Sequence, residues 1–435
     1  MANATDADTL VVAEWRRVVT RCIRGIPYNE HPSPSPSKFL NSSSTYFFTN
    51  LYPKILEDIN DLKNNNPNPT VPPAISSIDN PAIPPSSYLG RGNFLMTSIH
   101  QLEHEYEQLV HLVEGGKLPR EFFAIAMRMK YQIIPVIASV LEEGCAYFGP
   151  GSENNNNCGP NIRLGYYMLD EWMLRLMSGL HNRLVYQPVD VGRSTSSPSA
   201  LNSDLDFNKI QNSYLNGDVV AIDNFLSRDG LHHLRTVALD STTFFDAKLG
   251  YLGSYQDDGL SSSWLDSLGR ELQERLPKIL NNLPLRQAWM YKYDSYNAKL
   301  KQGIRIHADQ ATVNLNIWLT PDDANLGVGN GGLIIHNAAA PEQAIFSTDG
   351  FNSWNGVASE GRMHAWLLEK GVGNVTVPYR YNRCVMFNSA LLHETDHFEF
   401  KKDYRSRRIN LTLLFGNFAN ANGDESLKNV ASYVT

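Results

Sequence analysis

The feature that most constrains the fold is a change of hydrophobic rhythm about halfway along this 435-residue chain. Up to residue 186, apolar residues recur at the spacing of amphipathic helices, whereas after residue 207 they form short runs bounded by Gly, Pro and Asn. The first pattern favours helices and the second favours strands. The stretch between them, 187–207, is rich in Ser and Pro and poor in apolar residues, which is typical of a linker. We therefore predict an α+β protein with a helical N-terminal domain over residues 1–186.

Within this helical part, the breaker-rich stretches 64–87 and 153–160 predict loops. The segments with helical rhythm are Leu10–Ile26, Tyr46–Leu62, Phe94–Val113, Arg120–Leu141 and Leu164–Leu184.

The second domain is predicted over residues 208–420, with a C-terminal tail over 421–435. Two helices are expected early in it, one capped by Ser227 and one over Trp264–Leu280. The predicted strands are a short one within 218–226, then Ala288–Tyr293, Ile304–His307, Val313–Leu319, Leu333–His336, Val375–Pro378, Cys384–Phe387 and Ile409–Phe415. Many short strands separated by turn residues predict a sandwich or a barrel.

Composition limits the class of partner. The net charge of −7 argues against a nucleic-acid or anionic-membrane partner, which would favour a basic surface. The N-terminus lacks the pattern of a signal peptide, and no run of about 18 apolar residues exists, so we expect a cytoplasmic protein. The sequence leaves the oligomeric state open. The four cysteines, Cys22, Cys145, Cys158 and Cys384, are too sparse for a disulfide scaffold. Cys145 and Cys158 flank a loop and could meet, but we expect them to be reduced. No C-x-x-C pair occurs, so we expect no cysteine zinc site.

The segment RIHAD, at 305–309, carries the strongest chemical signal. Alternate side chains of a strand share a face, so His307 and Asp309 would project together. A third ligand must come from elsewhere, and we predict His393, which lies 84 residues after Asp309 in the run ALLHETDHF. Two imidazoles and one carboxylate on one side of an ion form the facial triad suited to iron(II) and oxygen chemistry.

A predicted anion-binding strand follows, in RRINLT at 407–412. Arg408 lies 15 residues after His393 and would share a face with Asn410 and Thr412. A buried guanidinium needs an anionic partner, and its fork matches a carboxylate. Arg407 is adjacent, so the register could be off by one. Asn410 favours Arg408, since the two must point inward together.

The order H-x-D, distal His, then Arg resembles the 2-oxoglutarate/iron(II)-dependent dioxygenase superfamily, over about residues 214–418. The resemblance implies a double-stranded β-helix (a jelly-roll, cupin-like fold), with iron(II), 2-oxoglutarate as co-substrate and O₂. It implies that the 2-oxo acid end chelates the metal, while the far carboxylate pairs with Arg408, helped by Asn410. A tyrosine on an upstream strand often completes such a pocket, and Tyr291 and Tyr293 are the candidates.

The reaction expected from this resemblance is oxidation of a C–H bond. Halogenating relatives carry Gly or Ala where this chain has Asp309, so its presence favours hydroxylation, desaturation, demethylation or oxidative cyclisation. A small molecule is the preferred substrate, such as an amino acid or a natural-product intermediate, ahead of a protein side chain. Arg305, Asn316 and Trp318 are candidate substrate contacts. An ion pair at the barrel rim explains Arg305 equally well, and a polar outer strand face explains the other two.

Two functions from other classes stay open at this stage. HQLEH, at 100–104, matches the H-x-x-E-H pattern of a zinc peptidase, with His100 and His104 as ligands and Glu103 beside them. A β-helix that has lost catalysis and serves as a binding scaffold is the other. We interpret three further histidines of the second domain as structural or surface groups rather than metal ligands, namely His336, His364 and His397.

Overall fold

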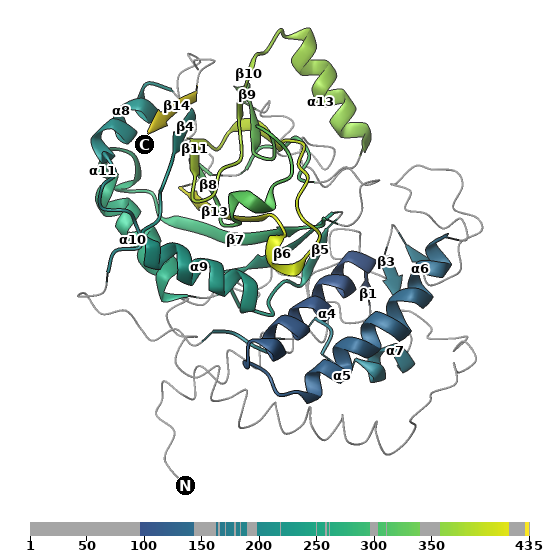
Figure 1. Cartoon of the computed structure of the whole chain (residues 1–435). Coiled ribbons are helices and arrows are strands. Elements are labelled where there is room, and N and C mark those ends of the chain that lie inside the picture. The colour runs from purple at the N-terminus through teal and green to yellow at the C-terminus, as the bar shows by residue number, and fades with distance from the viewer. Residues whose placement is uncertain are drawn as a thin grey trace. The chain divides into compact units, whose positions relative to one another are not determined.

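The fold is taken from a computed structural model (Figure 1). The residues it describes are 96–142, 162–163, 166–169, 171–177, 180–182, 184–188, 198–217, 219–248, 250–256, 259–260, 262–295, 303–309, 311–339, 357–416 and 431–434. The helices predicted at 10–26 and 46–62, and three of the four cysteines, lie outside these residues. Within them, none of the helices has the length and apolar character needed to cross a membrane.

The chain divides into two compact units. The first comprises Met1–Gly192, Leu239–Lys248 and Leu252–Ser261, and the second comprises Arg193–Ala238, Leu249–Tyr251 and Ser262–Thr435. Two stretches that the sequence placed in the second domain, 239–248 and 252–261, therefore belong to the first unit. Hydrogen bonds explain part of this division: Gln108, in the helix Ile99–Glu114 of the first unit, donates to the carbonyls of Leu239 and Ser241.

The first unit is mainly helical. Ser98 caps α4 by accepting a hydrogen bond from the Gln101 amide, and the apolar side of that helix packs against α5 in one core. The prediction of a helix over 164–184 is wrong in part, since Tyr166–Met168 forms a strand that pairs with Met96–Thr97. Two adjacent tyrosines suit a pleated strand better than a helix. The elements are β1 (Met96–Thr97), α4 (Ile99–Glu114), α5 (Glu121–Arg128), η5 (Met129–Ile133), α6 (Ile134–Glu142), β2 (Ile162–Arg163), β3 (Tyr166–Met168), α7 (Glu171–Leu176) and β5 (Asp246–Lys248), while β6 (Tyr251–Tyr255) begins in the second unit.

Two antiparallel sheets form the frame of the second unit (Figure 1). In the main sheet, strands follow the order β14 (Ala431–Val434), β4 (Val219–Ile222), β11 (Cys384–Asn388), β8 (Val313–Trp318), β13 (Ile409–Phe415) and β7 (Leu285–Tyr293). Only the β14–β4 pair among these is parallel. The second sheet has the order β10 (Asn374–Val377), β9 (Leu333–Ala339) and β12 (Leu391–Thr395).

Most predicted strands of this unit are confirmed. β6, which begins in this unit, was not predicted, and there are three further differences. β14 lies in the segment predicted as a tail, and β12 was not predicted because the polar triplet His393–Thr395 hides its strand pattern. Residues 304–307 form no regular strand, but His307 makes an isolated antiparallel bridge to His393.

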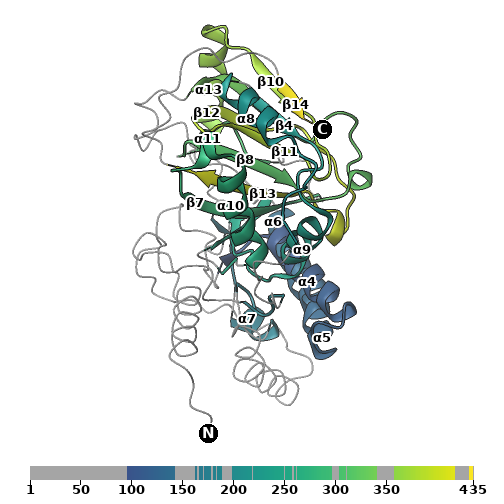
Figure 2. The ribbon, with the colours of Figure 1, turned by 90° about the vertical axis from the view of Figure 1, so that its left-hand side faces the viewer.

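Helices cover the outside of both sheets. α8 packs against β4 and β14, as Figure 2 also shows. Ser227 caps α9 by accepting from the Gly230 amide, as predicted. On the second sheet, Met363 and Leu367 of α13 pack against Ile306 and Leu392. The helices are α8 (Phe207–Leu215), α9 (Arg228–Asp240), α10 (Ser263–Arg275), α11 (Pro277–Leu280) and α13 (Val357–Glu369).

A buried ion pair ties β4 to β11, and its removal should destabilise the second unit. Asp223 accepts from Arg383 Nε at 2.6 Å and Nη2 at 3.0 Å, and both side chains are buried. We expect Asp223→Ala to cost about 3–5 kcal/mol, because it strands a buried guanidinium. The matched control is Asp323→Ala, which breaks an exposed pair with Lys401 and should cost about 1 kcal/mol or less. Urea unfolding midpoints measure both, and equal losses would contradict the prediction.

Candidate metal centre and co-substrate pocket

The structure brings His307, Asp309 and His393 together. One ligand atom from each lies within 4.8 Å of the others. Nε2 of His307 is 3.6 Å from Asp309 Oδ1, and Nε2 of His393 is 3.5 Å from Asp309 Oδ2. Ions such as iron(II) hold these donors at roughly 2.0–2.3 Å, so neighbouring ligand atoms around one ion stand about 3 Å apart. The three residues therefore have the spacing of one metal site, closed by small side-chain movements.

The local backbone explains why these side chains meet. The His307 amide donates to the His393 carbonyl at 3.0 Å, and the His393 amide returns the bond at 2.8 Å. On either side, the Thr395 amide donates to Ile304 and the Asp309 amide donates to Ser389. Residues 304–309 thus run along β12 without forming a regular strand. The period of two holds over 306–309, where His307 and Asp309 face the pocket while Ile306 packs outward.

Both imidazoles are held in the tautomer that a metal needs. Nδ1 of His307 lies 2.7 Å from the Arg305 carbonyl, and Nδ1 of His393 lies 2.9 Å from the Leu391 carbonyl. A carbonyl can only accept, so each Nδ1 carries the proton and donates. In the neutral form of each imidazole, Nε2 therefore presents its lone pair to the space beside Asp309.

The charges suit a cation. Burial, and then the neighbouring His393 imidazole, lowers the pKa of His307 to about 4 against the opposing effect of Asp309. Burial alone would raise the pKa of Asp309, but interaction with both histidines and the hydrogen bond from Asn314 hold it below its ordinary value. At pH 7 the site thus holds a neutral imidazole at His307 beside a carboxylate anion. No proton must leave these two residues when a metal binds.

A ladder of side-chain amides continues from the carboxylate across the main sheet. Asn314 Nδ2 donates to Asp309 Oδ2 at 2.7 Å, and Asn316 Nδ2 donates to Asn314 Oδ1 at 2.7 Å. Asn410 Nδ2 then donates to Asn316 Oδ1 at 2.7 Å and to Thr412 Oγ1 at 2.8 Å. The ladder orients Asp309 and links it to the strand that carries Arg408. The alternative of a polar outer strand face is therefore wrong for Asn316, which is buried.

The three proposed metal ligands and the predicted anion-binding residues line the same pocket. It lies between the two sheets and has an empty volume of about 510 Å³, which includes space open to solvent. Its lining includes Tyr291 and Tyr293 of β7, as well as Arg408 and Asn410. Tyr251, Trp289 and Thr395 also line it and were missed by the sequence analysis. For Tyr251, no motif points to the site, because β6 reaches the pocket only through tertiary packing.

Arg408 is buried, and one nitrogen of its guanidinium group makes no hydrogen bond. Its Nε donates to the Gly331 carbonyl at 2.8 Å and Nη2 donates to the Gly332 carbonyl at 3.3 Å. Nη1 is buried without a hydrogen-bond partner. The guanidinium carbon lies 4.5 Å from the centre of the Tyr293 ring and 5.6 Å from that of Phe398, so aromatic faces hold the cation in place. A buried, unpaired donor group in a pocket calls for an acceptor, and an anionic ligand supplies it.

The glycine pair that positions Arg408 has a clear conformational requirement. Gly331 has φ +85°, a region that favours glycine. A Cβ on Gly332 would lie 1.8 Å from the Val377 carbonyl oxygen, so only glycine fits there. The sequence signal was present in the run GGLIIH before β9, but its link to Arg408 depends on tertiary structure.

Arg407 and Arg408 point to different surroundings, and only Arg408 of the two lines the pocket. Arg407 faces Asp294, with Nη1 3.9 Å from Oδ1, and is not among the residues that line the pocket. Of the proposed substrate contacts, Asn316 lines the pocket, whereas Arg305 and Trp318 do not. Trp318 is fully buried and stacks on Tyr379, with ring centres 5.1 Å apart. It therefore belongs to the core beside Arg408, whose guanidinium carbon lies 5.9 Å from the centre of the Trp318 ring.

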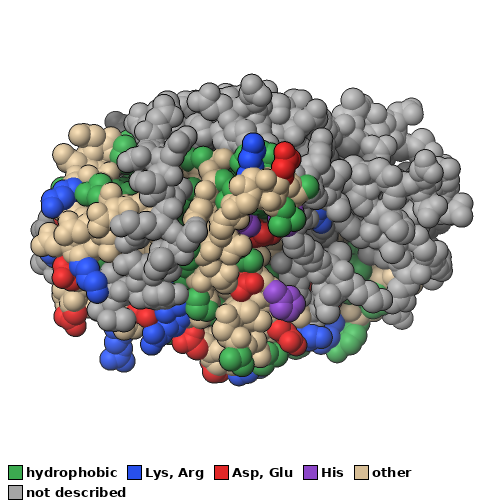
Figure 3. Space-filling model, turned by 90° about the horizontal axis from the view of Figure 1, so that it is seen from above, with side chains coloured by type: hydrophobic (Ala, Val, Ile, Leu, Met, Phe, Trp, Pro, Cys, Tyr) green, Lys and Arg blue, Asp and Glu red, His purple; other side chains and the backbone are tan. Residues whose placement is uncertain are grey.

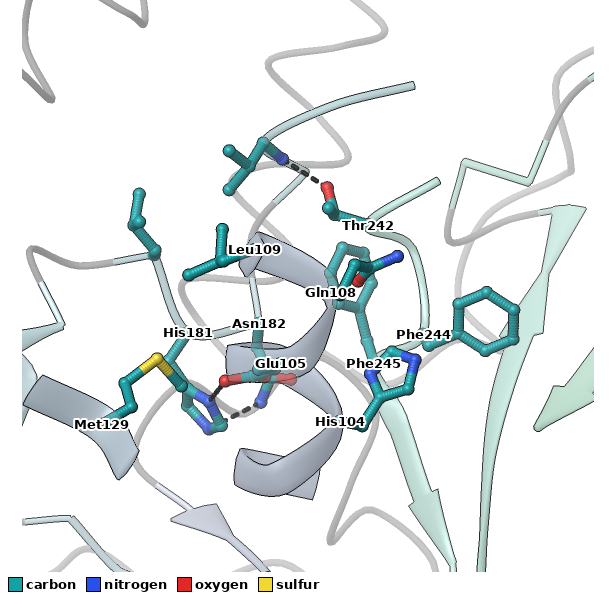
Figure 4. A pocket seen from close by; sticks show the side chains of 12 residues that line it. His104, Glu105, Gln108, Leu109, Met129, His181, Asn182, Thr242, Phe244 and Phe245 are labelled. Carbon is teal, nitrogen blue, oxygen red and sulfur yellow. Dashed lines mark hydrogen bonds and ion pairs between the residues drawn. The ribbon is translucent and has the colours of Figure 1, made fainter. Parts of the chain in front are cut away.

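The zinc-peptidase pattern is not assembled as a metal site. Among the described residues, the groups of three or more ligands that converge do not include His100, Glu103 and His104. His100 Nδ1 lies 2.9 Å from the Ser98 hydroxyl, and the His104 ring packs at 5.6 Å from Phe244. Figure 4 shows His104 in a pocket of the first unit, on the side toward Phe244 and Phe245. The i, i+4 spacing is present, but the helix gives the two imidazoles separate partners.

Comparisons with known proteins find similarity only at the level of structure. No family model matches the chain, and no curated protein matches it. A non-heme alpha ketoglutarate dependent carbocyclase from nogalamycin biosynthesis is 13% identical, with 51% of this chain and 87% of that chain covered and a TM-score of 0.33. An oxidoreductase of the 2-oxoglutarate–iron(II) oxygenase family from Burkholderia pseudomallei is 10% identical, covering 52% and 100%, with a TM-score of 0.30. A prolyl-4-hydroxylase from Pseudomonas putida is 14% identical, covering 48% and 99%, with a TM-score of 0.29.

These structures are of the class that the sequence motif resembles. Their TM-scores are low, so the function proposed below is based on the geometry of the site itself.

Proposed function

We propose that this protein is an iron(II)- and 2-oxoglutarate-dependent oxygenase, and that its second unit is a double-stranded β-helix. One observation carries the proposal: a single pocket contains a two-histidine, one-carboxylate group and a buried arginine whose Nη1 lacks a partner. The first feature suits iron(II), and the second suits the far carboxylate of a dicarboxylic 2-oxo acid.

Each residue then has a defined task. His307, Asp309 and His393 hold the metal, with Nε2 of both imidazoles as donors. When bound, iron(II) supplies oxygen activation with 2-oxoglutarate as the electron source. Arg408 binds the far carboxylate of 2-oxoglutarate, and Asn410 sits beside it on β13. Tyr291 and Tyr293 close that side of the pocket and exclude water.

The substrate is proposed to be a small molecule whose C–H bond is hydroxylated, desaturated or used for ring closure. The Tyr251, Trp289 and Tyr291 rings that line the pocket offer apolar contact to a small molecule, beside a few polar groups that could orient it. Seen from above, acidic and basic side chains of the described residues are interspersed without a continuous basic patch (Figure 3). The net charge of −7 does not favour a nucleic acid as the substrate.

The decisive experiment is turnover of 2-oxoglutarate to succinate by iron-loaded protein under air. We expect slow succinate release without substrate and faster release with it, because a bound substrate excludes water from the pocket and iron(II) held there would supply the reaction with oxygen. The panel should contain amino acids, natural-product intermediates and peptides, the last to detect side-chain hydroxylation. His307→Ala is the inactive control. Iron-bound protein that releases no succinate with any compound would favour the binding-scaffold interpretation.

A further inference from the structure

A second group of metal-ligating side chains lies on the opposite face of the sheet that carries His393. It consists of His336 on β9, Glu394 on β12 and His364 on α13, with ligand atoms within 4.8 Å of one another. Nε2 of His336 is 3.3 Å from Glu394 Oε1, and Nε2 of His364 is 3.0 Å from the same oxygen. The sequence analysis interpreted both histidines as structural or surface groups.

The alternation of β12 places the two groups back to back. His393 and Thr395 line the co-substrate pocket, so Leu392 and Glu394 point to the outer face. β9 pairs with β12 and turns His336 to that same outer face, within reach of Glu394. α13 covers this face through Met363 and Leu367, and this packing brings His364 over the sheet.

We propose that His336, His364 and Glu394 form a second divalent-metal site of the zinc type. Around a tetrahedral Zn²⁺ with bonds of roughly 2.0–2.2 Å, ligand atoms stand about 3.4 Å apart, close to the two distances seen here. Two imidazoles and one carboxylate form a zinc donor set that leaves a fourth position for water. His336 and Glu394 are buried, while the His364 side chain is 40% exposed, which gives the ion a path of entry.

Zinc at this site would act as a clamp. It would join one helix to two strands of the second sheet, and one of those strands carries His393. The inference does not depend on the proposed oxygenase function, since the two groups share no ligand.

The test is metal stoichiometry of untagged, chelator-stripped protein titrated with zinc against a chromophoric competitor. The unmodified chain should bind two equivalents, because zinc also occupies the His307 group. His364→Ala and His364→Gln should each bind one equivalent tightly. Zinc affinity at the altered site should fall roughly 100-fold, about a quarter of the binding free energy of a four-ligand zinc site. His307→Ala should keep the outer-site zinc and lose the inner one. The matched control is His397→Ala, an exposed histidine three residues beyond Glu394, which should still bind two.

Folding is checked by thermal melts. In the absence of metal, His364→Gln should melt like the unmodified chain, since glutamine can still hydrogen-bond to Glu394. Zinc should raise the melting temperature of His307→Ala but not that of His307→Ala combined with His364→Gln. The proposal is overturned if His364→Gln binds as much zinc as the unmodified chain, or if zinc stabilises both of these variants equally. In that case the three side chains form a hydrogen-bonded cluster only.

Discussion

Replacing Asp309 with glycine should abolish substrate oxidation, with a fall in succinate release of more than about 100-fold. Loss of an outer partner of a metal ligand already costs about 10–100-fold, and Asp309 is proposed as a direct, charged ligand. The glycine also removes the acceptor of the Asn314 hydrogen bond, so the amide ladder loses its end point. Succinate release and bound iron, measured on the same sample, separate lost chemistry from lost metal.

The matched control is Asp323→Gly, which alters an exposed carboxylate outside the pocket and should leave turnover unchanged. The same experiment tests the reaction type. Because Asp309 fills the position that a chloride would need, the unmodified protein should yield oxidised and not chlorinated product even at high chloride. A chlorinated product would contradict the role proposed for Asp309.

Replacing Arg408 with alanine should weaken 2-oxoglutarate binding by about 2–5 kcal/mol, or roughly 30- to 4,000-fold in Kd. The substitution leaves the far carboxylate of the co-substrate buried without a cation, in a pocket that has no other Arg or Lys side chain among the described residues of its lining. Iron binding should persist, because Arg408 donates its hydrogen bonds to the Gly331 and Gly332 carbonyls and not to the three proposed metal ligands. Calorimetry under anaerobic conditions, with manganese in place of iron, measures the affinity.

Two further variants test the register of β13. Arg408→Lys keeps the charge but loses the fork that reaches the Gly331 and Gly332 carbonyls, so an intermediate affinity is expected. Arg407→Ala disturbs the buried contact with Asp294 and should lower thermal stability while leaving the Kd for 2-oxoglutarate unchanged. If Arg407→Ala weakens 2-oxoglutarate binding and Arg408→Ala does not, then Arg407 binds the co-substrate and the proposed role of Arg408 is contradicted.

Local pattern in the sequence determined most of what the proposed function depends on. The period of two in an extended segment puts His307 and Asp309 on one side, and it does so even though residues 304–309 form only an isolated bridge. The same period separates Arg408 from Arg407 and aligns it with Asn410. These relations hold over two or three residues, where backbone geometry alone fixes the direction of a side chain.

Only the tertiary structure decided which distant residues complete the site. The Asn314–Asn316–Asn410 ladder crosses between strands almost 100 residues apart in sequence, and the carbonyl that holds Arg408 comes from Gly331. Strand alternation left Trp318 either in the pocket or on an outer strand face, and the structure instead buries it against Tyr379 in the core.

The outer histidine group depends on tertiary structure most of all. His336, His364 and Glu394 come from two strands and a helix, and no spacing in the sequence relates them. Periodicity tells which way a side chain points from its own element, but strand order and helix packing determine what it meets there. The sequence therefore specified the direction of the proposed iron ligands, and the fold alone brought the second group together behind them.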